Sequence, residues 1–96
     1  MGNRIQLKHP EGKKAVAIDK LKYDIICNAI LNYLKKKGEA THTEISEVIT
    51  DDFKKSKTKF EGSILWYVEW VKLDLLANKI IAKVAKTSPQ KYELMQ

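Results

Sequence analysis

The stretch from Phe60 or Glu61 to Asn78 is the most apolar part of the chain and constrains its fold more than any other segment. At helical spacing, four aliphatic residues fall within about 60° of one another, namely Ile64, Val68, Val71 and Leu75. A second apolar group lies on nearly the opposite side and comprises Trp66, Trp70, Leu73 and Ala77. A helix that is apolar on two sides is either packed between other elements or exposes a surface for a partner. The sequence therefore predicts a central helix that ends at Asn78 as a left-handed stop.

Two further helices are predicted before this one. Asp19 is placed to cap the first, which Lys35–Lys37 and Gly38 would close. Its predicted apolar face comprises Leu21, Ile25, Ile26, Ala29, Ile30, Tyr33 and Leu34. The second begins with the capping-box spacing of Thr41 and Glu44, and it carries the short apolar stripe Ile45, Val48 and Ile49. Asp51–Asp52 is predicted to end it, and the lysine-rich residues 54–59 then form a polar connection.

A β-hairpin is predicted at each end of the chain. Residues 4–8 and 14–18 alternate apolar and polar side chains around the turn-forming residues 9–13. Residues 79–85 and 91–94 form a second pair around the turn at 87–90. The side chains of this pair that we expect to point inward are Ile80, Ala82, Val84, Tyr92 and Leu94.

This order of elements predicts a single α+β domain over residues 1–96, with an N-terminal hairpin over 1–19 and a helical core plus wing over 20–94. Residues 21–94 resemble the winged helix-turn-helix superfamily, which implies a third helix as the reader and a C-terminal hairpin as the wing. Nearly the whole chain is similar to a small uncharacterised bacterial family, through His9-Pro10-x-Gly12, Asp19-x-x-x-Tyr23, Gly62-x-x-x-Trp66-x-x-x-Trp70-Val71-x-Leu73-Asp74-Leu75-x-Ala77, Lys79-Ile80-Ile81 and Pro89-x-x-Tyr92-x-Leu94. That family has no assigned activity, so the resemblance implies a fold and transfers no site.

The net charge of +6 is unevenly distributed, which indicates non-specific DNA binding through a basic loop and wing. The predicted backbone-contacting residues are Lys54, Lys55, Lys57, Lys59, Lys83, Lys86 and Lys91. Residues 38–53, by contrast, hold five carboxylates and no Lys or Arg. The third helix offers no Arg, Asn or Gln before Asn78, and base reading depends mainly on those side chains. Sequence-specific reading by this helix is therefore not expected.

A protein-interaction or homodimerisation module is the alternative function. Trp66 and Trp70, one helical turn apart and joined by Leu73, would form a compact hydrophobic anchor for a partner. The same tryptophans could instead pack beneath the N-terminal hairpin or against the first helix. The sequence leaves these arrangements open.

Enzymatic activity, a metal and a cofactor are not expected. His9 and His42 have no carboxylate or cysteine at ligand spacing, and the chain contains no phosphate-binding glycine loop or nucleophile motif. Cys27, the single cysteine, excludes an internal disulfide and is expected to be a small buried hydrophobe. No apolar run has the length of a membrane span. A cytoplasmic location without a small-molecule ligand is the expectation.

Overall fold

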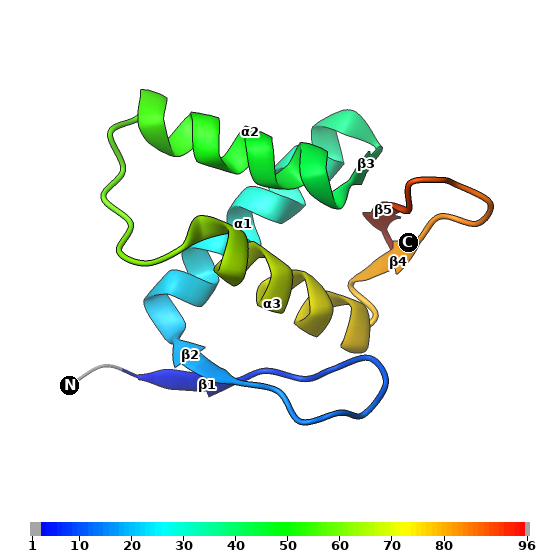
Figure 1. The fold of residues 1–96 in the computed structure, drawn as a ribbon, viewed down its shortest axis with the longest axis horizontal. Helices are drawn as coiled ribbons and strands as arrows, with labels where there is room; N and C mark the ends of the chain where they lie inside the picture. The colour runs from blue at the N-terminus through cyan, green and yellow to red at the C-terminus, as the bar shows by residue number, and fades with distance from the viewer. Residues whose placement is uncertain (1–2, 96) are drawn as a thin grey trace.

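The computed structural model describes residues 3–95, in which three helices and two small antiparallel sheets form an α+β fold (Figure 1). Residues 1, 2 and 96, which the predicted domain assignment includes, lie outside the described part. In chain order the elements are β1 (Arg4–Gln6), β2 (Ala17–Asp19), α1 (Lys20–Lys37), β3 (Glu39–Thr41), α2 (His42–Lys55), α3 (Ile64–Ala77), β4 (Ile81–Lys83) and β5 (Lys91–Leu94).

Helix α1 begins and ends where the sequence predicts. The Asp19 carboxylate accepts a hydrogen bond from the Lys22 amide at 3.2 Å, and the Gly38 amide donates to the Leu34 carbonyl at 2.8 Å. Its apolar face is narrower than predicted, because Leu21 is 73% exposed and Ile25 40% exposed. Only the single row Ile26, Ile30 and Leu34 is fully covered by other elements.

The boundary between α2 and α3 differs from the prediction on both sides. Helix α2 continues past Asp51–Asp52 to Lys55, and Asp51 forms an i,i+4 ion pair with Lys55 at 3.0 Å in its last turn. Helix α3 starts at Ile64, because Gly62 has a φ of 101° and the Ser63 side chain caps the helix by accepting from the Trp66 amide.

The first predicted face of α3 forms the centre of the core. Val68, Val71 and Leu75 have no exposed surface, and α3 packs against both α1 and α2. Its end differs from the prediction, since Asn78 has a φ of −88° and the left-handed residue is Lys79, with a φ of 59°. The Ile80 amide reaches the Leu75 carbonyl at 2.9 Å across this turn.

The two sheets differ in how far the sequence predicts them. Strands β1 and β2 pair antiparallel with Ile5 opposite Ile18, as a shorter version of the predicted hairpin. The second sheet has the order β3-β5-β4, and its edge strand β3 was not predicted. Strand β3 has only three residues, too few for a recognisable strand pattern. Its hydrogen bonds to β5, which lies far along the chain, make it a strand.

The predicted inward side of β4 is wrong by one residue. Ile81 is 1% exposed, whereas Ile80 is 41% exposed and Ala82 is only half-buried. The left-handed turn at Lys79 redirects the chain, so that Ile81 pairs with Leu94 on the side of the sheet that faces the core. Tyr92 is buried on this side, as predicted.

Candidate nucleic-acid interface and neighbouring surfaces

The predicted lysines of the α2–α3 connection lie at one end of the molecule. Lys54, Lys57 and Lys59 are exposed, and the connection forms the left edge of Figure 1. Lys55 is exposed as well and pairs with Asp51, and this carboxylate raises the pKa of the Lys55 ammonium through their hydrogen bond.

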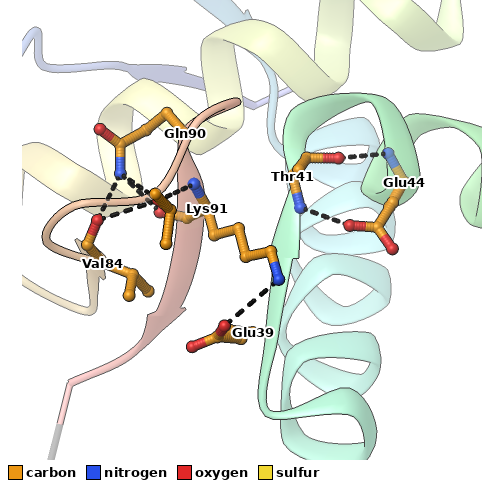
Figure 2. Close-up of polar contacts among 7 residues, drawn as sticks. Glu39, Thr41, Glu44, Val84, Gln90 and Lys91 are labelled. Atoms are coloured by element: carbon orange, nitrogen blue, oxygen red, sulfur yellow. Dashed lines mark hydrogen bonds and ion pairs between the residues drawn. The ribbon is translucent and has the colours of Figure 1, made fainter.

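The predicted lysines of the C-terminal hairpin, residues 81–94, lie at the opposite end of the molecule, at the right of Figure 1. Lys83 and Lys86 are exposed, whereas Lys91 is half-buried and its ammonium lies 3.4 Å from a Glu39 carboxylate oxygen on β3 (Figure 2). The Gln90 side chain fixes the base of this hairpin by donating to the Val84 and Lys91 carbonyls, each at 2.9 Å. Lys91 therefore pairs with Glu39 across the sheet, whereas the side chains of Lys83 and Lys86 are exposed.

The N-terminal hairpin, residues 4–19, brings further lysines to this end. Figure 1 shows its loop passing beneath the C-terminal part of α3. Pro10 from that loop lines one surface hollow together with Lys79 and Lys83. A second hollow, next to Ala77 at the end of α3, is lined by lysines of the same loop. We call this end of the molecule the basic end. Its exposed lysines are five that line the two hollows, Lys8, Lys13, Lys14, Lys79 and Lys83, together with Lys86 in the loop of the C-terminal hairpin.

A buried carboxylate holds the N-terminal hairpin in this position. Asp74 on α3 is 3% exposed and accepts a hydrogen bond from the Lys8 amide at 2.8 Å and another from the Tyr23 hydroxyl at 2.7 Å. Burial of the phenol and its hydrogen bond to Asp74 raise the pKa of Tyr23. Glu11, in the hairpin loop, lies 3.7 Å from Lys13.

The outer face of α3 combines exposed and packed side chains. Leu65 is 58% exposed and Trp66 42% exposed, whereas Trp70 is half-buried against the core and Leu73 is half-buried. The ring centroids of Trp66 and Trp70 are 6.3 Å apart. The two tryptophans therefore differ in role: Trp70 packs against the core, and Trp66 presents apolar surface to solvent.

A polar cluster between α2 and α3 was missed in the sequence. Lys72 is 4% exposed, and its ammonium lies 3.2 Å from His42 Nδ1 and 3.3 Å from a Glu69 carboxylate oxygen. The His42 Nε2 atom lies 3.5 Å from Glu69 and 3.4 Å from the Ser46 hydroxyl. Burial, and then the Lys72 charge, lower the pKa of His42, although Glu69 opposes them. Glu69 reaches His42 from another helix, a contact that the spacing of residues in the sequence does not reveal.

The interruption of the apolar run at Lys72, one turn after Glu69, is the sequence signal that could have indicated this cluster. Glu69 and Ser46 both face Nε2 of the imidazole, while Lys72 occupies Nδ1, so these residues do not form a nucleophile–base–acid relay. Cys27 is half-buried, less than predicted, and burial raises the pKa of its thiol.

Residues 3–95 contain neither a metal-binding cluster nor a membrane-spanning helix. No group of three or more His, Cys, Asp or Glu side chains within this range is arranged to hold a metal ion. Over the same range, no helix combines the length and the apolar character that crossing a membrane requires.

Comparison with known proteins identifies the family. The sequence profile of a family described as "Family of unknown function (DUF6958)" matches residues 4–92. The chain therefore belongs to this family, and the match covers the N-terminal hairpin, the three helices and the C-terminal hairpin as far as Tyr92 in β5. No curated protein and no solved structure matches the chain.

Proposed function

We propose that the protein is a winged-helix domain that binds the phosphate backbone of duplex DNA through its basic end, without reading the base sequence. The order α1, β3, α2, α3, β4, β5 and the sheet order β3-β5-β4 support the fold assignment, with the C-terminal hairpin as the wing. The clustering of exposed lysines from two distant parts of the sequence carries the functional proposal.

The physical basis of this binding is the release of counterions from DNA. Six ammonium groups that each meet a phosphate give a log–log dependence of affinity on salt with a slope of about −5. The outer face of α3 offers apolar side chains and Glu69 rather than base-reading groups, so affinity should be nearly independent of sequence.

The test is fluorescence anisotropy with a labelled duplex of about 20 base pairs, at several salt concentrations between 50 and 200 mM. Lys14→Glu combined with Lys83→Glu should weaken binding on the order of a hundredfold, since both attractions become repulsions. Lys54→Glu combined with Lys59→Glu is the matched control at the other end of the molecule and should weaken it less than about threefold. Absence of duplex binding by the unmodified chain at 50 mM salt would refute the proposal.

Homodimerisation through the outer face of α3 is the second candidate, favoured by the exposure of Leu65 and Trp66. Large aromatic side chains anchor interfaces, and two copies of one helix face can pack isologously. Light scattering after size exclusion should give twice the chain mass, and Trp66→Glu should return it to that of a monomer. A monomeric unmodified chain at about 100 μM would rule out this dimer.

A further inference from the structure

Three lysines occupy backbone conformations that favour glycine. Lys57, Lys79 and Lys86 have φ values of 56°, 59° and 59°. In this region the Cβ atom of an ordinary residue approaches its own carbonyl group, which glycine avoids. All three side chains are exposed, and within residues 3–95 their ammonium groups make no hydrogen bond or ion pair.

Lys57 and Lys79 stand in equivalent positions at the ends of α2 and α3. The Thr58 amide reaches the Phe53 carbonyl at 2.9 Å, and the Ile80 amide reaches the Leu75 carbonyl at 2.9 Å. These are the bonds of a Schellman motif, whose left-handed residue is most often glycine. Lys86 takes the same conformation near the tip of the C-terminal hairpin, away from any helix end.

The contribution of a lysine to stability differs among these places. A cation after the last turn of a helix interacts favourably with the helix dipole, which helps to account for Lys57 and Lys79. No helix terminates near Lys86, so this explanation does not apply there. Lys79 and Lys86 stand before and after β4 in the basic end, whereas Lys57 belongs to the α2–α3 connection, which lies at the other end of the molecule (Figure 1).

We propose that Lys79 and Lys86 are the residues of the basic end whose ammonium groups contact phosphates of the duplex. This inference rests on the proposed function and names the contacts on which it depends. Both side chains are exposed, and the two lysines stand before and after β4 along the chain. Lys79 was not among the binding residues predicted from the sequence.

Glycine substitution separates binding from folding, because glycine relieves the left-handed conformation while it removes the charge. Lys79→Gly combined with Lys86→Gly should keep or raise the Tm by up to about 3 °C, since strain relief is partly offset by a more flexible unfolded chain. The same double variant should weaken duplex binding on the order of tenfold at 50 mM salt and make the salt slope shallower by about 2. Lys57→Gly, the matched control, should keep the duplex affinity within about twofold.

Each outcome of this experiment is decisive. Unchanged affinity of the double variant, with binding by the unmodified chain intact, overturns the inference while the charge-reversal test of the basic end still stands. A Tm lowered by several degrees in Lys86→Gly also overturns it, because the lysine would then stabilise the turn itself. A loss of affinity in Lys57→Gly as large as in the double variant overturns the assignment to the basic end. Failure of the unmodified chain to bind duplex removes the proposed function and this inference together.

Discussion

Asp74 and Lys72 lie two residues apart on α3 and are almost equally buried, but the structure treats these opposite charges differently. Asp74 accepts two hydrogen bonds, at 2.7 and 2.8 Å, from uncharged donors on α1 and on the segment after β1. Lys72 has looser contacts, at 3.2 and 3.3 Å, with two titratable groups, and its ammonium lies 4.8 Å from the centre of the Tyr92 ring.

The difference shows that a buried charge can serve as an anchor or as a titratable contact, depending on its partners. Breaking the Asp74 contacts leaves a hydroxyl and an amide, both in part-buried hydrogen bonds, without their acceptor. Breaking the Lys72 contacts leaves His42 and Glu69 in positions where water reaches them, since their side chains are 32% and 45% exposed. Asp74 should therefore contribute more to stability, and the Lys72 cluster should make stability depend on pH.

Asp74→Ala tests the anchor and should have the largest effect. It should lower the free energy of unfolding by about 3 kcal/mol, because the Tyr23 hydroxyl and the Lys8 amide lose their common acceptor. Urea denaturation measures this value, and Asp74→Asn, which keeps one carbonyl acceptor, should lose about half as much. A loss below about 1 kcal/mol for the alanine variant would contradict the anchor role.

Tyr23→Phe removes one of the two hydrogen bonds to Asp74. It should lower the free energy of unfolding by about 1.5 kcal/mol, since the acceptor of this bond is charged. The raised pKa of Tyr23 means that the folded state favours the neutral phenol. The contribution of Tyr23 to the free energy of unfolding is therefore fully present below pH 10, the ordinary pKa of tyrosine, and falls as the pH rises above that value. In Tyr23→Phe this alkaline loss of stability should be reduced, as urea denaturation between pH 8 and 11 would show.

Lys72→Met removes the second buried charge and should lower the free energy of unfolding by less than about 1 kcal/mol. Methionine fills a similar volume, and the former partners His42 and Glu69 can be hydrated. Urea denaturation at pH 7 is again the measurement. A cost equal to that of Asp74→Ala would remove the distinction between the two buried charges.

The pH dependence of the Lys72 cluster is the smallest predicted effect. The lowered pKa of His42 means that the folded state favours the neutral imidazole. The contribution of His42 to the free energy of unfolding is therefore fully present above its ordinary pKa of 6.5 and declines as the pH falls below that value. His42→Gln should flatten the profile of unfolding free energy between pH 7 and 5. An NMR titration that gives His42 a pKa above 6.5 would contradict the predicted direction.

Local sequence signals predicted the helices well and long-range contacts poorly. The Asp19 cap and the Thr41–Glu44 capping box depend only on residues three positions apart, and both are present in the structure. Strand β3 depends on pairing with β5, about fifty residues later, and its own three residues carry no strand pattern. The prediction of which β4 side chains face the core was wrong, because the left-handed turn at Lys79 precedes the strand and decides which of its residues point inward.

The candidate surface was predicted only in part, for the same reason. Lysine clusters are visible in the sequence, but contiguity with the N-terminal hairpin loop is not. Lys55 and Lys91, both among the predicted contacts, form ion pairs, one on the same helix and one across the sheet, as Lys13 of the basic end does with Glu11. The sequence also gave no means of deciding that Trp70 packs against the core while Trp66 remains exposed.

Composition, helical periodicity and capping residues alone determined an α+β chain with a basic surface and a central apolar helix, because these properties depend on the residues themselves and their near neighbours. Only the tertiary structure decided that Asp74 joins α1 to the N-terminal hairpin, that Lys72 meets His42, and that lysines from both hairpins share one end of the molecule. Such contacts join residues 30 to 66 positions apart, and their energies depend on distance and burial in space rather than on separation along the chain.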